Sequence, residues 1–293
     1  MQYEGTVYRP PSEGNSLILQ ATIGCSYNRC SYCAMYIDKR FRQRSRDDLL
    51  KDMADAQSVY GAKNVRRIFL ADGDALIMRT PRLLQLLEDC REHFPNLQRA
   101  SVYASPQSLL GKSVAEIQEL SEAGLPLYFL GAETGHPEIL KNIAKGVDRE
   151  QLIRAGRMVV DAGARLSVIM LLGIGGTELS HEHAVESGSF LSEVNPRYIS
   201  TLTITPVPGT PFHDEVAAGR VVLPDERGMI AEQRTMIAHM NVSRAIYRGN
   251  HISNSMPVGG NLPGDKGKLL AVLDQVIGNE QIPLRQRPSA DSL

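Results

Sequence analysis

Residues 16–36, SLILQATIGCSYNRCSYCAMY, begin as an apolar run and end in a loop that holds three of the chain's four cysteines. The apolar run is rich in isoleucine and leucine, which predicts a buried strand. Three thiols in one short loop cannot all pair as disulfides, and no apolar signal segment stands at the start. We therefore expect a cytoplasmic protein with reduced thiols, in which clustered cysteines bind metal or carry out redox chemistry.

The rest of the chain alternates short apolar runs with longer amphipathic segments. The runs predict six strands, within residues 16–25, 65–76, 99–106, 125–135, 165–176 and 198–211. The amphipathic segments predict five helices, within residues 45–61, 80–95, 113–124, 149–163 and 180–194. This alternation is typical of parallel strands covered by helices, so the fold class is α/β. An open doubly wound sheet and a barrel-like wrap both fit, and both place function at the carboxyl ends of the strands.

Chemically unusual residues follow every predicted strand. The cysteine loop follows the first strand, and the later strands are followed by Asp72-Gly73-Asp74, Ser105-Pro106, Glu133-Thr134-Gly135, residues 173–176 and residues 206–211. Because the carboxyl ends of parallel strands meet at one edge, we expect one rim to collect all of these residues.

The alternation stops near residue 214, which suggests three parts. We expect an N-terminal extension at 1–15, a barrel at 16–213 and an extension at 214–293 that packs on the barrel. Within the last part, a helical stretch at 227–248 precedes a loop rich in glycine, proline and asparagine at 249–267. A final helix is expected at 268–277.

Composition argues against two broad classes. The chain carries 32 basic and 33 acidic residues, a net charge of -1, which argues against a general polyanion binder. The stretch KRFRQRSR at 39–46 is its one candidate basic patch, and a solvated loop entering a helix is the alternative. No run approaches the roughly 20 apolar residues of a membrane span.

The cysteine loop has the spacing Cys25-x4-Cys30-x2-Cys33. Three thiolates can hold three irons of a [4Fe-4S] cluster and leave the fourth iron open to another ligand. A zinc site remains an alternative, with His183 or His251 completing a set of three cysteines and one histidine. Cys90 lies in the middle of a predicted helix, where a buried, small apolar role is expected.

Taken together and in this order, the motifs of residues 16–212 resemble the radical SAM superfamily, in particular the branch of oxygen-independent coproporphyrinogen oxidase and the elongator-type tRNA enzymes. The resemblance rests on the cysteine loop with Tyr32 before its last cysteine, and on DGDA at 72–75, where the family usually carries Gly-Gly-Glu-Pro. It also rests on YFLGAETG at 128–135, LLGIGG at 171–176 and PVPGTP at 206–211. The family's usual loop has three residues between its first two cysteines, whereas this chain has four, so we expect the extra residue to bulge outward.

The resemblance implies a partial (β/α)6 TIM-type barrel with a C-terminal helical and loop extension. It implies a [4Fe-4S] cluster on Cys25, Cys30 and Cys33, and S-adenosylmethionine (SAM) on the open iron. Reductive cleavage of SAM would then give a 5'-deoxyadenosyl radical, with an electron donor such as flavodoxin or ferredoxin.

The resemblance also implies a set of SAM contacts: Tyr32, Asp72, Gly73, Asp74, Ser105, Glu133, Lys145, Gly173 and Ile174. Residues 72–74 would receive the methionine ammonium, and Ser105 would lie, like Glu133, near the ribose hydroxyls. Glu133 would accept from the ribose hydroxyls, and Lys145 would face the methionine carboxylate. Tyr32 and the 173–175 backbone would lie near the adenine. Packing in the barrel core for Tyr32, a turn cap for Asp72 and a solvated helix end for Lys145 are the alternatives.

The leading functional hypothesis is radical modification of a small or medium-sized organic substrate. Polar loops on a rigid scaffold often bind ligands, so Arg248, His251 and Asn254 are substrate-side candidates, with an ordinary surface linker as the alternative. Modification of tRNA or protein, aided by the basic stretch, is the second hypothesis, although the near-neutral charge counts against nucleic acid. A non-catalytic zinc-binding module is the remote alternative. His181, Glu182 and His183 open a predicted helix, and we assign them no role.

Overall fold

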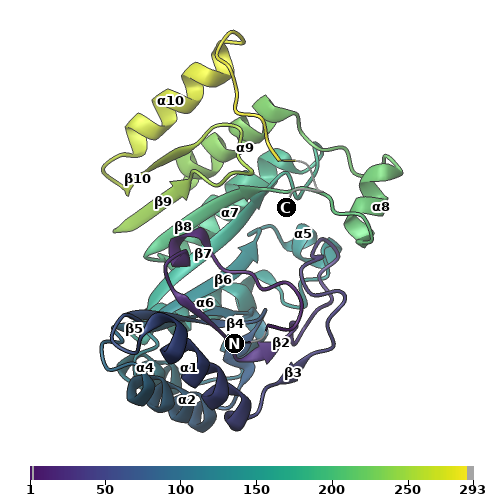
Figure 1. Ribbon diagram of the computed structural model, residues 1–293. Coiled ribbons are helices and arrows are strands. Elements are labelled where there is room, and N and C mark those ends of the chain that lie inside the picture. The colour runs from purple at the N-terminus through teal and green to yellow at the C-terminus, as the bar shows by residue number, and fades with distance from the viewer. Residues whose placement is uncertain (2, 289–293) are drawn as a thin grey trace. The chain divides into compact units, whose positions relative to one another are not determined.

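The computed structural model describes residues 1 and 3–288 (Figure 1). The chain divides into two compact units, each of which is assembled from segments far apart in the sequence. The first unit holds Met1–Asn28, Met35–Leu130 and Met158–Leu166, and the second holds Arg29–Ala34, Gly131–Arg157 and Ser167–Leu293, as far as these are described.

The strands of the main sheet are mostly parallel. They are β1 (Leu17–Gln20), β4 (Arg67–Ala71), β5 (Arg99–Ala104), β6 (Leu127–Glu133), β7 (Arg165–Leu172), β8 (Tyr198–Thr203), β9 (Ala245–Gly249) and β10 (Val258–Leu262). Hydrogen bonding follows the order β1-β4-β5-β6-β7-β8-β9-β10, which is open because β1 and β10 are its two ends. Only β10 is antiparallel to its described partner, β9. A separate antiparallel pair, β2 (Thr22–Ile23) and β3 (Arg42–Gln43), brackets the cysteine loop.

The helices alternate with the strands along the chain, as the sequence predicts. They are α1 (Arg46–Tyr60), α2 (Thr80–His93), α3 (Pro106–Leu110), α4 (Val114–Glu122), α5 (Pro137–Asn142), α6 (Arg149–Asp161), α7 (Ser180–Val194), α8 (Pro211–Ala217), α9 (Glu226–His239) and α10 (Lys266–Gly278). Two short 3-10 helices lie at Pro11–Glu13 and Ala75–Ile77. No helix in the described part of the chain is both long and apolar enough to span a membrane.

Local signals in the sequence account for where several helices begin. The Ser45 hydroxyl accepts a hydrogen bond from the Asp48 N–H at the start of α1. At the start of α4, Ser113 and Glu116 form a reciprocal capping box, which satisfies two N–H groups that the helix leaves unpaired. Strand β7 has the near-continuous apolar sequence expected of a strand covered on both faces, and six of its eight residues are buried.

The six predicted strands and five predicted helices are all confirmed, but the C-terminal prediction is partly wrong. The helix expected at 227–248 ends at His239, and residues 245–249 form β9 instead. The loop expected at 249–267 contains β10, and α8 was not predicted. Burial alternates along β9 with a period of two, with Tyr247 fully inside, which is strand rather than helix behaviour. The division at residues 213 and 214 stays a prediction.

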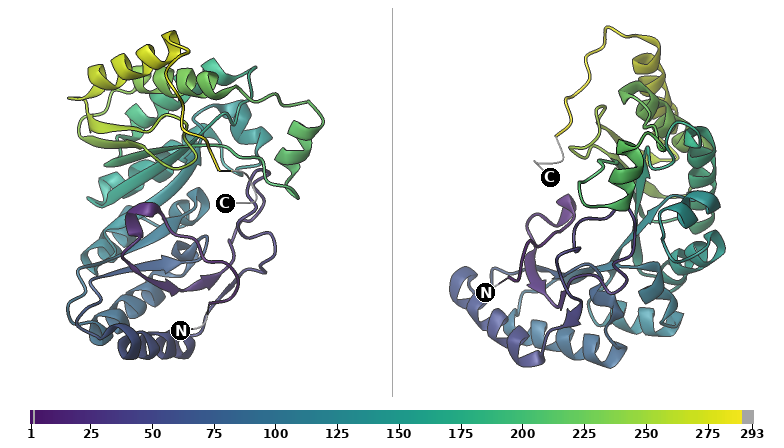
Figure 2. Two further views of the ribbon diagram at one scale, coloured as in Figure 1. Left: turned by 45° about the horizontal axis from the view of Figure 1, so that its top comes forward. Right: turned by 90° about the vertical axis from the view of Figure 1, so that its right-hand side faces the viewer.

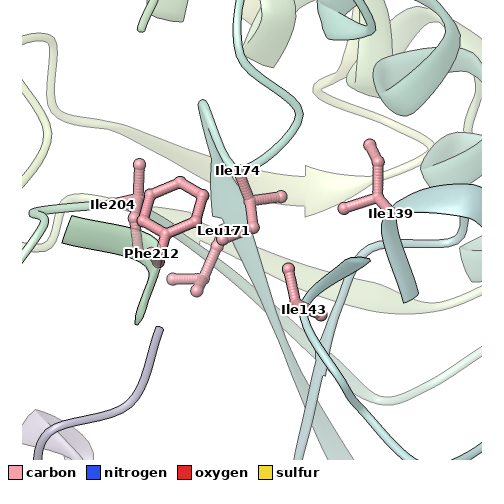
Figure 3. Close-up of a cluster of buried hydrophobic side chains, with 6 residues drawn as sticks. All are labelled: Ile139, Ile143, Leu171, Ile174, Ile204 and Phe212. Atoms are coloured by element: carbon pink, nitrogen blue, oxygen red, sulfur yellow. The ribbon is translucent and has the colours of Figure 1, made fainter. Parts of the chain in front are cut away.

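An apolar cluster forms part of the core of the second unit. It contains Ile139, Ile143, Leu171, Ile174, Ile204 and Phe212, which are drawn as sticks in Figure 3. Tyr32, from the cysteine loop, packs against it. Helix α9 packs on α7 and on α10, and α10 lies beside α9 in both views of Figure 2.

A polar network is buried beside this core. The Glu232 carboxylate, on α9, accepts hydrogen bonds from the Gly173 N–H at 2.6 Å and from the Ser180 hydroxyl at 2.5 Å. His183 lies 3.4 Å from Glu232, and its ring bonds to the Thr134 hydroxyl and the Leu171 carbonyl. Burial raises the pKa of Glu232 to about 7 and lowers the pKa of His183 to about 4. At neutral pH the pair therefore carries at most one charge.

This network predicts a pH-dependent difference between Glu232→Gln and the wild type. Between the usual glutamate pKa of 4.5 and the folded value of about 7, the folded state holds a proton on Glu232 that the unfolded state lacks. Glu232 therefore destabilises the fold progressively as the pH rises through this window, whereas a glutamine does not. We expect the unfolding free energy of Glu232→Gln, relative to the wild type, to increase by up to about 1.4 kcal/mol per pH unit.

The measurement is urea unfolding of both proteins at pH 5.0, 6.0 and 7.5. His183 contributes the opposite slope, since its depressed pKa costs stability as the pH falls below the ordinary histidine value of 6.5, but it is present in both proteins. Exposed Glu178→Gln is the matched control. A constant difference across this range would contradict the prediction.

Candidate cofactor site

The three cysteines of the loop are divided between the two compact units. Cys25 belongs to the first unit, and Cys30 and Cys33 belong to the second. All three are half-buried, whereas Cys90 is fully buried in α2. Among the described residues, no three His, Cys, Asp or Glu side chains are placed together as ligands of a single metal ion.

In the first unit, the end of β4 packs closely against the cysteine loop. A Cβ atom added to Gly73 would lie 2.5 Å from the Tyr36 ring and 2.9 Å from the Cys25 Cβ. These separations are shorter than any real carbon contact, so only glycine fits at this position. The backbone after β4 thus lies directly beside the first predicted cluster ligand.

Asp72 precedes this glycine and is fully buried. Its Oδ2 atom accepts hydrogen bonds from the Lys39 ammonium at 2.8 Å, the Gly24 N–H at 3.1 Å and the Gln20 amide at 3.2 Å. Lys39 follows the cysteine loop and Gly24 begins it, so one carboxylate anchors both ends of the loop. The Oδ1 atom of Asp72 is buried and has no hydrogen-bond partner in the described part of the chain.

Asp74 is also fully buried, and its carboxylate serves the chain itself. Oδ1 accepts from the Ser105 N–H at 3.1 Å, and Oδ2 accepts from the Ser105 hydroxyl at 2.8 Å and the Ser26 hydroxyl at 2.5 Å. Asp74 therefore ties the cysteine loop to the end of β5. The carboxylate that was predicted to contact the methionine ammonium thus accepts three hydrogen bonds from the chain, and that contact stays a prediction.

In the second unit, the loop segment with Cys30 and Cys33 is held by backbone hydrogen bonds. The Ser31 N–H donates to the Ile143 carbonyl at 3.0 Å, and the Ser31 carbonyl accepts from the Phe212 N–H at 2.9 Å. A turn between the two cysteines is closed by a bond from the Cys33 N–H to the Cys30 carbonyl at 3.2 Å. Tyr32 is thereby directed onto the apolar cluster of this unit.

Beside this segment lies a buried ion pair between Lys145 and Glu133. The Lys145 ammonium is 3.0 Å from Glu133 Oε1 and 3.4 Å from the Tyr32 hydroxyl. Both charged side chains are less than a tenth exposed. Gly131 makes room for the carboxylate, since an added Cβ there would lie 2.3 Å from Oε1. The structure thus brings together three predicted SAM contacts, Tyr32, Glu133 and Lys145.

The Lys145 ammonium interacts electrostatically with Glu133 and with the two cysteines of the same unit. Burial alone would lower the pKa of Lys145, but Glu133 and the negative charge of Cys30 and Cys33 in their ionised form raise it above its ordinary value. Lys145 is therefore a cation at neutral pH, and a cation near a thiol favours the thiolate form. Burial and the neighbouring Glu133 raise the pKa of Tyr32 well above its ordinary value, so its hydroxyl stays protonated. Two cysteine sulfurs next to a fixed cation fit the donor chemistry of an iron-sulfur cluster.

The predicted adenine contacts lie where β7 ends. Gly173 has a φ of +81°, a left-handed conformation that favours glycine, and the end of the Met229 side chain occupies the space beside it. Its N–H is held by Glu232. The Ile174 side chain belongs to the buried apolar cluster (Figure 3), so only its backbone is available to a ligand.

The three substrate-side candidates occupy different environments. The Asn254 side chain is buried and bonds to the Thr203 hydroxyl and to the carbonyls of Thr201 and Gly249, so it holds its own loop together. The Arg248 guanidinium stacks on the Tyr198 ring, 4.8 Å from its centroid. The pKa of His251 is lowered by burial and by the charge of Arg285, so this imidazole is neutral at pH 7.

The basic stretch at 39–46 is largely neutralised by the chain itself. Four of its cations pair with carboxylates, as Lys39–Asp72, Arg42–Glu4, Arg44–Asp52 and Arg46–Asp89. Sequence reasoning missed these partners, because each pairing joins residues that are distant along the chain or lie on another element. Glu232 and Gly131 were missed for the same reason, and no pattern in their own neighbourhoods identifies them.

The buried and exposed pairs of this stretch predict contrasting effects of the same change. Lys39→Met leaves Asp72 as an uncompensated buried charge and should cost about 3 kcal/mol or more. Arg42→Met breaks a pair in which both side chains are more than half exposed, and it should cost less than about 1 kcal/mol. Urea unfolding measures both.

The double variant Lys39→Met, Asp72→Asn removes both charges and should recover part of the loss. Equal costs for the two single variants would show that the Lys39–Asp72 pair does not anchor the loop.

The sequence is similar to those of known proteins. The Radical SAM superfamily matches residues 19–187, which is more than half of the chain. The heme chaperone HemW of Buchnera aphidicola is 20% identical over 207 residues, which cover 69% of this chain and 53% of HemW. The bacteriochlorophyllide d C-12(1)-methyltransferase of Chlorobaculum tepidum is 29% identical over 199 residues, which cover 67% of this chain and 41% of that protein. The chain thus spans about half the length of these curated relatives.

Solved structures agree on the fold. Coproporphyrinogen III oxidase (HemN) from Escherichia coli, described as a radical SAM enzyme, is 17% identical with a TM-score of 0.57, over 76% of this chain and 51% of HemN. Methylornithine synthase (PylB) is 18% identical with a TM-score of 0.53, over 78% of this chain and 63% of PylB. The cobalamin-dependent radical enzyme OxsB, with SAM bound, is 17% identical with a TM-score of 0.56, over 76% of this chain and 41% of OxsB.

These likenesses show that the α/β fold is the open partial barrel of such proteins. A coproporphyrinogen III oxidase, the kind of enzyme that the sequence resembles, is among the solved structures with this fold. The family match, together with the cysteine loop and the order of the strand-end motifs, leads to one conclusion: the chain belongs to the radical SAM superfamily of enzymes.

Proposed function

We propose that this protein cleaves SAM reductively and uses the resulting radical to modify a small or medium-sized organic substrate. Two observations carry the proposal. The family match covers the cysteine loop, and the buried Lys145 ammonium, paired with Glu133, interacts electrostatically with Cys30 and Cys33. When bound, a reduced [4Fe-4S] cluster and SAM supply a 5'-deoxyadenosyl radical that abstracts hydrogen from a substrate.

In this proposal Cys25, Cys30 and Cys33 hold the cluster through their thiolates. Gly73 allows the backbone after β4 to lie beside Cys25, where carbonyl oxygens can accept from the methionine ammonium. In this proposal Asp72 and Asp74 do not contact SAM and instead hold the cysteine loop in place. The first anchors the two ends of the cysteine loop, and the second ties the loop to Ser105.

Glu133 and Lys145 are the proposed SAM contacts of the second unit. Glu133 accepts from the ribose hydroxyls, and Lys145 faces the methionine carboxylate. Because the two side chains already fix each other at 3.0 Å, little ordering is needed when a ligand arrives. The rigid backbone at Gly173, held by Glu232, can approach the adenine closely.

A one-electron donor such as a flavodoxin or ferredoxin is needed to reduce the cluster. Four cations of the basic stretch at 39–46 are paired with carboxylates of the same chain, so they are less available to the phosphates of a tRNA. Direct hydrogen abstraction from a small substrate is therefore favoured over tRNA modification. The family match also favours an iron-sulfur ligand set over zinc.

The first test is anaerobic reconstitution with iron, sulfide, dithionite and SAM. We expect about four iron and four sulfide per chain and the formation of 5'-deoxyadenosine, detected by liquid chromatography with mass spectrometry. Cys30→Ala should lose the iron and the product. Cys90→Ala is the matched control and should keep both, since this thiol is buried in α2.

A protein that holds the full cluster and binds SAM, yet forms no 5'-deoxyadenosine, would refute the proposal. Stoichiometric zinc without sulfide in the native protein would do so as well.

The second test concerns Glu133. Glu133→Ala should weaken SAM binding by about ten- to a hundred-fold, the usual effect of losing a charge-assisted hydrogen bond. Asp74→Ala should weaken it less, because the Asp74 carboxylate is occupied by Ser26 and Ser105. The readout is a SAM titration followed by the low-temperature electron paramagnetic resonance of the reduced cluster, in variants with equal iron content. Unchanged SAM affinity in Glu133→Ala would remove this residue from the site.

A further inference from the structure

A pocket of about 440 Å³ lies in the second unit, directly after the end of β8. Ile204, Thr205 and Pro206, which follow the strand, form one wall. Leu223 and Glu226, before and at the start of α9, form a second wall, and the C-terminal segment 284–288 forms the third. The volume lies in the range of small-molecule sites, and the pocket opens at the carboxyl end of a parallel strand, where ligands of α/β folds bind.

The pocket adjoins the strand end assigned to SAM. The Ile204 N–H donates to the Leu172 carbonyl at 2.9 Å, so the pocket wall continues from the end of β7. An added Cβ on Gly173 would lie 3.2 Å from the Ile204 side chain. Ile204 therefore lines the pocket and also packs against Gly173, whose backbone is the predicted adenine contact.

The segment that closes the pocket is fixed by specific contacts. Arg285 donates from its guanidinium to the carbonyls of His251 and Asn254, and its own N–H donates to the Ser255 carbonyl at 2.9 Å. Arg287 pairs with Glu226 at 2.7 Å. This segment is the extended chain that follows α10 in Figure 2.

The charged side chains that line the pocket are two arginines and one glutamate. Glu226 offsets one of the two arginines, whereas Arg285 bonds to carbonyls, which carry no net charge. One net positive charge remains, and it favours an anionic ligand. Glu226 also has a buried oxygen, Oε2, without a hydrogen-bond partner among the described residues. The Glu226 side chain is 40% exposed, so a rotation of its carboxylate can present this oxygen to a ligand that supplies a hydroxyl or amino group.

We propose that this pocket binds a small organic acid with an apolar body and a hydroxyl or amino donor near its carboxylate. Arg285 recognises the carboxylate, Glu226 accepts from the donor, and Ile204, Pro206 and Leu223 contact the apolar body. That this acid is the molecule modified by the radical rests on the proposed function, whereas its binding does not.

The test uses three fluorinated probes of nearly equal shape and the reconstituted protein without reductant. 4-Fluoromandelate has the carboxylate and the hydroxyl, 4-fluorophenylacetate lacks the hydroxyl, and 4-fluoromandelamide lacks the charge. Fluorine NMR titration gives the three dissociation constants. We expect 4-fluoromandelate to bind tightest, 4-fluorophenylacetate about five-fold more weakly, and 4-fluoromandelamide about ten-fold more weakly.

Three variants distinguish recognition of the probe carboxylate from a structural effect on the segment 284–288. Arg285→Gln should abolish the preference for 4-fluoromandelate over its amide, whereas a merely structural loss would weaken all three probes equally. Glu226→Gln should tighten 4-fluorophenylacetate, because the net charge of the pocket becomes more positive. Arg220→Gln, which breaks an exposed pair with Glu215 outside the pocket, is the control and should change nothing.

Equal binding of the three probes, or none, would overturn the inference, and so would an unchanged preference in Arg285→Gln. Because no SAM is cleaved in this assay, the result is independent of 5'-deoxyadenosine formation. If the probes bind but no 5'-deoxyadenosine forms in the first test, the pocket inference stands and the proposed function is refuted. If 5'-deoxyadenosine forms but the probes do not bind, the proposed function stands and the pocket inference is refuted.

Discussion

Asp72 directly follows strand β4, and its carboxylate is fully buried. One oxygen of this carboxylate accepts three hydrogen bonds. A buried carboxylate is costly unless donors and a cation compensate it. The donors come from β1, from the start of the cysteine loop at Gly24 and from Lys39 beyond the loop. Compensation of one charge therefore fixes both ends of a loop that has little regular structure of its own. The position of Cys25 follows, since it comes directly after Gly24.

The second unit also contains buried carboxylates, and they are compensated by other partners. Glu133 is paired with Lys145, and Glu232 is compensated by Ser180 and by the Gly173 N–H. In both units, charged side chains at strand ends are oriented by the chain itself before any ligand arrives. Fixed charges of this kind interact strongly with a ligand, because they do not have to reorganise when it binds.

The sequence predicted the strands and helices where each segment carries its own signal. Strand β7 is a continuous apolar run, and α1 and α4 begin at serine caps. Strand β10 carries no such signal, because its sequence, VGGNL, holds two glycines and an asparagine. It becomes a strand by pairing with β9, which no local pattern shows.

The same distinction holds for the site. The cysteine spacing is local, so the loop could be recognised in the sequence. Lys39 was counted as part of a basic patch, although its partner Asp72 lies 33 residues away and was expected to contact SAM. His183 was considered only as an alternative zinc ligand, and it is a buried member of the Glu232 network. Long-range pairing, rather than residue type, decides these positions.

The C-terminal segment is attached mainly through backbone carbonyls. Arg285 bonds to the main-chain oxygens of His251 and Asn254, and its N–H bonds to that of Ser255. Every amino acid offers the same carbonyl, so this attachment does not depend on which side chains the loop carries. Exposed loop positions such as Ile252 can therefore be exchanged in evolution or by design without detaching the segment, whereas Arg285 cannot. The fold thus separates a position that must be kept from neighbouring positions that are free to diversify.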